Sequence, residues 1–231
     1  MKDFVYNPPK EPFLTILFED QDLMVIDKPS GLLCVPGRLK ENYDSILSRI
    51  WLRHPDAMAV HRLDMDTSGL MVVGLTKRAI SSLGRMFEKK EVKKRYLAVV
   101  EGNTQNCGQI DLPIRCDIEN RPLQIVDYEQ GKPSLTLYEK TDDFKYGKSI
   151  IDVNDTTVLK LTPVTGRSHQ LRLHLSSIGH PILGDRFYAG HNVIDKAQRL
   201  CLHAYNLEFK HPFKEELLSF STLPDFLEKK I

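Results

Sequence analysis

The sequence lacks the usual features of a secreted or membrane-bound protein. Only four of its 231 residues are cysteines, and no two of them form a Cys-x-x-Cys pair. Cysteines this scattered indicate reduced side chains rather than a disulfide framework. The N-terminus has no apolar signal segment, and the longest apolar run, 69–75, is far shorter than the ~20 residues of a membrane helix. We therefore expect a soluble, cytoplasmic protein.

Repeats, low-complexity segments and long linkers are also absent. Glycine and proline occur 13 times each, which is near average use, and 41% of the residues are hydrophobic. That hydrophobic fraction is too high for a disordered chain. At about 150 residues per domain the length allows one or two domains, and such a chain can bury a core without disulfides or a structural metal.

The net charge is only +1, yet the charge is unevenly distributed. Residues 77–95 contain eight basic and two acidic side chains. The basic residues of this stripe are Lys77, Arg78, Arg85, Lys89, Lys90, Lys93, Lys94 and Arg95. A positive stripe on a nearly neutral chain is typical of a surface that contacts a phosphate backbone. The alternative is an ordinary solvated helix face.

The hydrophobic pattern predicts many strands and few helices. Strands are expected at 14–18, 23–27, 69–75, 95–100, 135–138, 157–161 and 200–209. Asp44 is expected to cap a helix that ends before Pro55, and Thr76 is expected to cap the next helix. A short helix should start at Ser168 and stop at Gly179, and 139–155 should form an exposed hairpin or loop. Without regular βαβ alternation, the fold class is α+β with a mixed, mainly antiparallel sheet flanked by a few helices.

The segment 61–69, with the sequence His-Arg-Leu-Asp-Met-Asp-Thr-Ser-Gly, places polar side chains directly before a predicted buried strand. A polar loop anchored on a rigid strand is where catalytic groups tend to lie, and Asp64 and Asp66 are the candidate carboxylates. The alternative is turn chemistry, in which Asp66 satisfies the turn amides.

Five motifs, in order along nearly the whole chain, resemble the RluA family of RNA pseudouridine synthases. The central one is 61–69, which matches the His-Arg-Leu-Asp-x-x-Thr-Ser-Gly signature. Segment 27–32 resembles the Asn-Lys-Pro-x-Gly turn of the family but departs from it at Asp27. The other matches are 94–96, 165–185, and 202–204 with 211–212. The chain is most similar to the short members of the family that modify both ribosomal RNA and tRNA.

The resemblance implies an architecture and a substrate. We expect residues 1–231 to form one pseudouridine synthase catalytic domain in which 1–13 is an extended arm. Because only 60 residues precede His61, no separate N-terminal RNA-binding domain is expected. The implied partners are 23S ribosomal RNA and the tRNA anticodon stem-loop, with a single RNA class as the alternative. No cofactor, metal or obligate protein partner is implied, and a monomer is expected.

The resemblance also implies roles for individual residues. Asp64 carries over as the essential carboxylate, and Arg167 as the basic partner that keeps it ionised. Tyr96 would pack on the target base, while Arg62 would fill the stack that the flipped base leaves. The RNA-binding set is Arg62, His61, Lys89, Lys90, Lys93, Lys94 and Arg95. Gly166 would allow a close backbone approach beside Arg167.

Three other functions fit parts of the sequence. A metal hydrolase could use some of the eight histidines, but there is no His-Glu-x-x-His motif, and His169 and His174 suit one helical face poorly. A nucleoside or glycoside hydrolase could also use an Asp, but it usually needs a second carboxylate. A non-catalytic RNA-binding module would tolerate the loss of Asp64.

Overall fold

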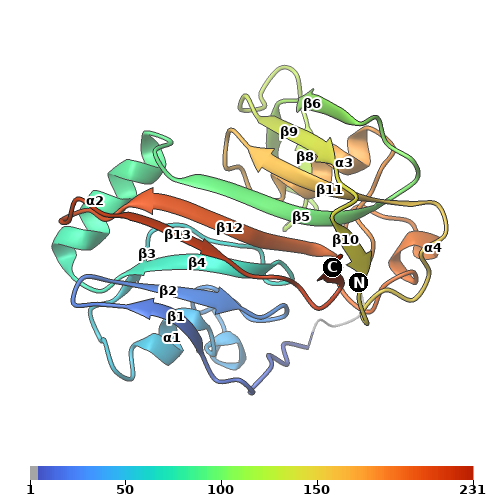
Figure 1. Cartoon of the computed structure of the whole chain (residues 1–231). Helices are drawn as coiled ribbons and strands as arrows, with labels where there is room; N and C mark the ends of the chain where they lie inside the picture. Colours follow the sequence, from blue (N-terminus) through green and yellow to red (C-terminus); the bar gives the residue numbers. More distant parts are fainter. Residues whose placement is uncertain (1–4, 231) are drawn as a thin grey trace. The chain divides into compact units, whose positions relative to one another are not determined.

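The computed structural model describes residues 5–230, which fall into two compact units. Unit 1 runs to residue 93 and includes 206–222, whereas unit 2 contains 94–205 and the residues after 222. Strands β5 (Lys93–Glu101) and β12 (Leu202–Lys210) contain two of the points where the chain passes from one unit to the other (Figure 1). No helix within 5–230 is long and apolar enough to cross a membrane.

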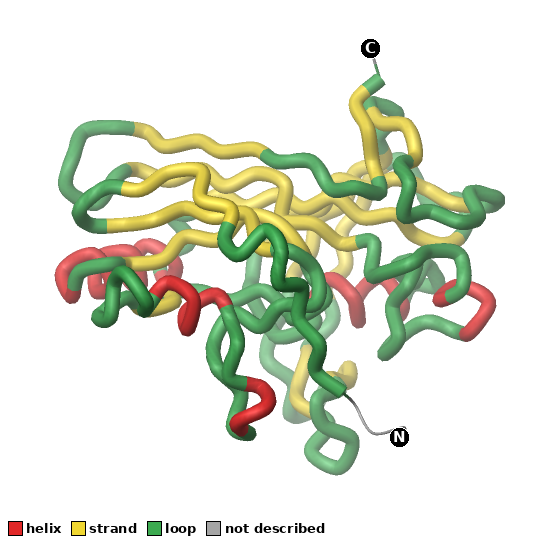
Figure 2. The backbone as a smooth tube through the Cα atoms, turned by 90° about the horizontal axis from the view of Figure 1, so that it is seen from below, coloured by secondary structure: helices red, strands yellow, loops and turns green. Residues whose placement is uncertain are grey.

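Unit 1 is built on an antiparallel sheet in which β2 lies between β1 and β4, and β3 also pairs with β4. Its remaining strand, β13, pairs with the 206–210 half of β12. Besides that half-strand, the elements of this unit are β1 (Thr15–Glu19), β2 (Leu23–Lys28), the 3-10 helix η1 (Lys40–Asn42), α1 (Ile46–Ile50), β3 (Met58–Ala59), β4 (Ser68–Gly74), α2 (Lys77–Glu88) and β13 (Leu217–Ser221). Figure 2 draws the strands in yellow and the helices in red.

The register of β2 against β4 decides which loops of unit 1 meet. Leu23 stands opposite Gly74, and Lys28 stands opposite Gly69. The segment that leaves β2 therefore lies beside the loop that enters β4, which is 61–67. Alternate residues of the two strands, among them Leu23, Val25, Leu70 and Val72, join one buried cluster with Leu83 of α2 and Phe209 of β12.

In unit 2, four strands of the ten-stranded sheet pair in the antiparallel order β5-β11-β9-β6. Two small ladders, β7 with β8 and β10 with β14, complete the pairing. Besides β5 and the first half of β12, its elements are β6 (Cys107–Asp111), β7 (Ile114–Cys116), β8 (Gln124–Val126), β9 (Leu135–Lys140), β10 (Phe144–Tyr146), β11 (Thr156–Pro163), α3 (Gln170–Ser177), α4 (His191–Ile194) and β14 (Leu227–Lys229).

The predicted α+β class is confirmed, since both units consist of antiparallel ladders with a few short helices. All seven predicted strands are present with shifts of one or two residues at their ends. The polar segment 139–155 contains the end of β9 and one short strand, β10. Of the predicted arm 1–13, the first four residues lie outside the described part. The rest has no helix or strand and is held by Arg49, which donates to the carbonyls of Pro9 and Phe13.

Two predicted helix starts are wrong by one residue. The α1 cap is Ser45 rather than Asp44, because Ser45 and Ser48 form a reciprocal capping box while the Asp44 carboxylate pairs with Arg49. The α3 cap is His169 rather than Ser168, and it has left-handed backbone angles and no side-chain cap bond. Thr76 caps α2 as predicted, by accepting from the amide of Ala79.

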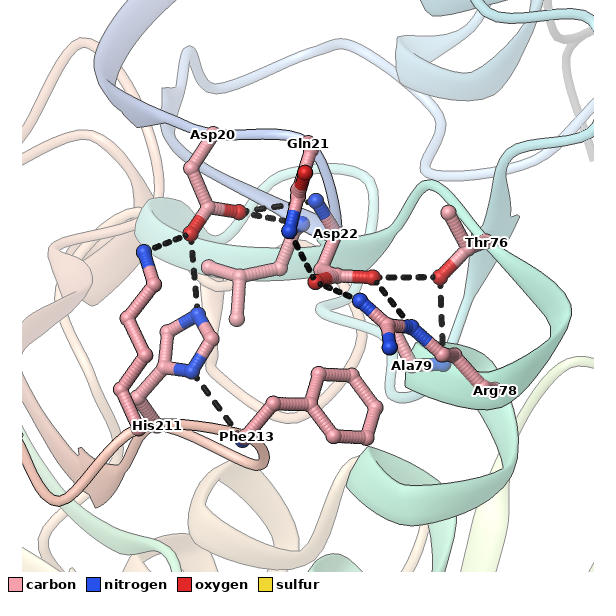
Figure 3. A network of polar contacts seen from close by, with 10 residues as sticks. Asp20, Gln21, Asp22, Thr76, Arg78, Ala79, His211 and Phe213 are labelled. Atoms are coloured by element: carbon pink, nitrogen blue, oxygen red, sulfur yellow. Dashed lines mark hydrogen bonds and ion pairs between the residues drawn. The ribbon is translucent and has the colours of Figure 1, made fainter.

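Two aspartates at the β1–β2 turn join three segments of unit 1 that are distant in sequence (Figure 3). Asp20 accepts from the amides of Asp22 and Leu23, from His211 Nε2 at 2.9 Å and from Lys214 Nζ at 2.7 Å. Asp22 is buried and accepts two bonds from Arg78, at 2.9 and 2.7 Å. Partial burial opposes ionisation of Asp20, but these donors outweigh it and hold its pKa well below its usual range.

The depressed pKa of Asp20 predicts acid-sensitive stability. A carboxyl group whose pKa is lower in the folded than in the unfolded state stabilises the fold fully above about pH 4, and this contribution is lost as the pH falls below that value. We expect Asp20→Asn to lower the free energy of unfolding at pH 7 by roughly 1–3 kcal/mol. The variant should also lose less stability than wild type between pH 5 and pH 3. Urea unfolding at several pH values measures both effects, and parallel curves for the two proteins would contradict the assignment.

Candidate active site

The signature loop 61–67 lies between β3 and β4, and it is tied to the segment that follows β2. The amide of Gly31 donates to the carbonyl of Met65 at 2.9 Å, and Ser30 Oγ donates to that of Asp66 at 2.7 Å. On the other side of Asp64, the thiol of Cys34 donates to the Leu63 carbonyl at 3.1 Å and accepts from the Leu63 amide at 3.3 Å. These bonds fix the backbone on both sides of Asp64.

Lys28 also contacts this loop, and its side chain is fully buried. Its ammonium donates to the carbonyls of Pro29, Leu32 and Met65 at 2.8–2.9 Å. A buried ammonium is tolerated only where hydrogen bonds replace its water shell. Lys28 therefore links the turn 29–32 to the residue next to Asp64.

Asp64 itself is half-buried, and its carbonyl accepts from the Thr67 amide at 3.2 Å, which closes a turn over 64–67. Asp66 is also half-buried, two residues further along that turn. Arg62 is exposed beside the pair. The loop thus presents a carboxylate and a guanidinium on a fixed backbone, which suits a reaction that develops positive charge on a sugar.

His61 supports the loop from the side of β4 and α2. Its Nε2 accepts from the amide of Val72 at 3.0 Å, so this nitrogen carries no proton, and its ring stacks on Phe87 with centroids 4.4 Å apart. These contacts orient the ring toward the protein interior. The sequence-based role of His61 in RNA binding stays a prediction.

Not every side chain of the basic stripe has an unneutralised charge that could contact a phosphate. Arg78 is paired with Asp22, and Lys93 is paired with Glu208 at 2.6 Å. Burial lowers the pKa of Lys94. The other five, Lys77, Arg85, Lys89, Lys90 and Arg95, are exposed.

Unit 2 carries the remaining predicted residues, Tyr96 and Arg167. Tyr96 is 8% exposed on β5, opposite Leu161 of β11. Arg167 is exposed, and its backbone amide donates to Gln170 Oε1 at 3.1 Å. Gln170 is buried and also bonds Thr165 and the Leu135 carbonyl, so it fixes the loop that bears Arg167.

Gly166 is exposed, next to Arg167. Among the described protein atoms, a Cβ at this position would meet only Lys94 Nζ, at an ordinary 3.9 Å. Packing within the protein therefore does not require a glycine there, and the close approach of this backbone to a bound substrate stays a prediction.

Comparisons with known proteins decide the family. The family model described as RNA pseudouridylate synthase matches residues 22–177. Two relatives, each described as dual-specificity RNA pseudouridine synthase RluA, come from Pasteurella multocida and Escherichia coli (strain K12). Each is 49% identical over 222 residues, which cover 96% of this chain and 98% of the relative. The chain belongs to the RNA pseudouridylate synthase family.

Solved structures agree with this assignment. Human RNA Pseudouridylate Synthase Domain Containing 1 is similar with a TM-score of 0.73 and 30% identity, covering 96% of this chain and 85% of that one. Human RNA Pseudouridylate Synthase Domain Containing 4 gives 0.67 and 26%, covering 91% and 88%. The family predicted from the five motifs is confirmed, and the chain is an isomerase.

The metal hydrolase alternative gains no support from the described residues. Within residues 5–230 no group of three or more His, Cys, Asp or Glu side chains is arranged to hold a metal ion. His174 is buried between Thr136 and the Leu112 carbonyl, and burial lowers its pKa. It serves as a core side chain.

The turn 27–32 was predicted as a motif, but its hydrogen bonds to the loop that carries Asp64 were not predicted. One signal was available, since Asp27 and Lys28 directly follow the apolar run 23–26, and a charged residue that is buried there needs polar partners. No comparable signal marked Cys34, whose position beside Leu63 depends on tertiary packing.

We predict that Lys28→Met lowers the free energy of unfolding by about 3 kcal/mol, because three carbonyls lose a charged donor whose own side chain is buried. Catalytic turnover should fall more than tenfold while RNA affinity changes little, since the loop loses its support beside Asp64. Urea unfolding and single-turnover kinetics measure the two effects. The control is Lys210→Met, an exposed lysine of the same unit, which should behave as wild type. Equal behaviour of the two variants would contradict the role of Lys28.

Proposed function

We propose that this chain isomerises specific uridines to pseudouridine in structured RNA, both in 23S ribosomal RNA and in the tRNA anticodon stem-loop. The observation that carries the proposal is the position of Asp64, in the family signature, on a backbone held from both sides. The dual range is supported by the printed names of relatives that are 49% identical over nearly the whole chain. Restriction to one RNA class is the alternative.

The reaction breaks the N1–C1′ bond of the uridine, turns the uracil, and forms a C5–C1′ bond. C5 loses its proton and N1 takes up a proton, so the product is an isomer of the substrate. Atoms and electrons balance without an oxidant, a reductant or a nucleotide cofactor. The proposed essential group is the Asp64 carboxylate, which can stabilise charge on the sugar, attack, or remove a proton. Each of these uses needs an ionised and oriented carboxylate, and the fixed loop supports that orientation.

The remaining residues are proposed to expose and hold the target. Extruding a base from folded RNA costs a few kcal/mol, which contacts in the protein must offset. We assign Arg62, exposed beside Asp64, to the vacated stack, because a planar guanidinium stacks well. Tyr96 is assigned to the target base and Arg167 to the catalytic charge, while Lys89 and Lys90 of the stripe contact phosphates. We further propose that the protein acts in the cytoplasm as a monomer and that both units serve one catalytic domain.

Asp64→Asn is expected to abolish turnover and to leave RNA affinity within about twofold, because the change is nearly isosteric. The assay uses RNA tritiated at uracil C5, since forming the C5–C1′ bond releases that tritium to water. Asp66→Asn is the matched control and should retain most activity. Full activity of Asp64→Asn would refute the assignment.

Offering tRNA and 23S ribosomal RNA separately tests the substrate range. Release from both supports the dual range, whereas release from one alone supports the restricted alternative. Free uracil as product would identify a hydrolase, and RNA binding without release would identify a non-catalytic module.

Salt dependence tests the basic stripe. Lys89→Gln combined with Lys90→Gln should reduce the slope of log Kd against log salt by about 1.5, if each lysine neutralises one phosphate. Lys93→Gln is the control, because Glu208 already pairs with that ammonium, and its slope should change little. An unchanged salt slope in the double variant would show that the stripe is only a solvated face.

A further inference from the structure

A buried ion pair in unit 2 supports an exposed aromatic side chain. Arg172 and Asp185 have side chains only 2% and 0% exposed, and they form two bonds, of 2.8 and 2.6 Å. Burying two charges costs free energy that the pair itself often only offsets. Replacing both residues by apolar side chains would cost little stability, so the net stability of the fold does not by itself explain the pair.

Asp185 also fixes the backbone of the two residues that lead to the surface. Its Oδ1 accepts from the amide of Phe187 at 2.9 Å and from that of Tyr188 at 3.3 Å. The guanidinium of Arg172 lies over the Phe187 ring, 4.9 Å from its centroid. The buried pair therefore holds Phe187 in one orientation.

Phe187 remains 42% exposed in spite of these contacts. His169 stacks on it with centroids 5.6 Å apart and an interplanar angle of 25°. Tyr188 completes the support, since its hydroxyl bonds His169 Nδ1 at 2.8 Å and accepts from the Gln124 amide at 2.9 Å. An exposed aromatic ring that Arg172 and His169 hold in place is preorganised for stacking, because little conformational entropy is lost on binding.

The surroundings of this ring carry positive charge. Arg186 is exposed directly before Phe187, and Arg167 is exposed two residues before His169. The Cα atoms of Arg167 and His169 are at most about 7 Å apart along the chain. Aromatic rings combined with cations are the usual surface for unpaired bases of RNA.

We propose that His169, Arg186 and Phe187 form a stacking surface for one unpaired base of the substrate RNA, other than the target uridine. The proposal rests on the proposed function, because it assigns a second contact to the same RNA. Phe187 stacks on the base, and Arg186 contacts its phosphate. The surface acts in RNA selection rather than in the bond-making steps.

Equilibrium binding and kinetics with an RNA stem-loop test the proposal. Phe187→Leu should raise Kd and KM about tenfold and leave kcat at saturating RNA within twofold, because stacking on one base is lost. Phe187→Trp should restore affinity, and Arg186→Gln should weaken binding about threefold. Tyr128→Leu, which changes another exposed aromatic residue of unit 2, is the control and should match wild type.

A fluorescent base gives a direct signal. With 2-aminopurine placed at each loop position in turn, wild type should quench one position other than the target, and Phe187→Leu should remove that quenching. Thermal unfolding of Phe187→Leu near the wild-type midpoint, or rescue by Phe187→Trp, excludes a folding defect. Unchanged Kd and KM for Phe187→Leu, or equal losses in Tyr128→Leu, would overturn the stacking surface.

The two proposals fail separately. If wild type releases no tritium but binds RNA with a Phe187-dependent Kd, the isomerase proposal fails and the stacking surface stands. If wild type releases tritium and Phe187→Leu is indistinguishable from it, only the stacking surface fails. If wild type binds no stem-loop RNA, the stacking surface fails as well.

Discussion

The buried ammonium of Lys28 is the interaction on which the candidate site depends. It joins two loops that are more than thirty residues apart, and it does so at the end of the β2–β4 ladder, where Lys28 stands opposite Gly69. A one-residue slip of that ladder would turn Lys28 to the other face of the sheet and leave its charge without these carbonyls. The register of β2 against β4 therefore also determines the position of the Asp64 loop.

Most of the strands could be predicted because their apolar runs are long and end at clear turn signals. The exact helix starts could not, because adjacent residues were both good caps. Asp44 and Ser45 differ little in intrinsic preference, and the choice falls to Ser45 because Arg49 takes the Asp44 carboxylate. The first cap residue of α3 is His169 rather than Ser168. His169 has left-handed backbone angles, which a sequence pattern does not reveal.

The candidate site shows the same division. Asp64, Arg62, Tyr96 and Arg167 could be named from the sequence because they stand in a family pattern. The contacts that fix the loops of Asp64 and Arg167 could not be predicted, since Cys34, Ser30 and Gln170 act through backbone groups of distant residues. Charge counting along 77–95 overstated the free positive charge, because the acidic partners Asp22 and Glu208 lie far away in sequence.

Native-state hydrogen exchange tests most directly whether the Asp64 loop is part of the rigid sheet. The amide of Gly31, bonded to Met65, and that of Leu63, bonded to Cys34, should exchange about as slowly as those of the β2–β4 ladder. Exchange of both at the rate of an unprotected loop, while the ladder stays protected, would show that the loop moves independently. It would contradict the account of how Asp64 is positioned.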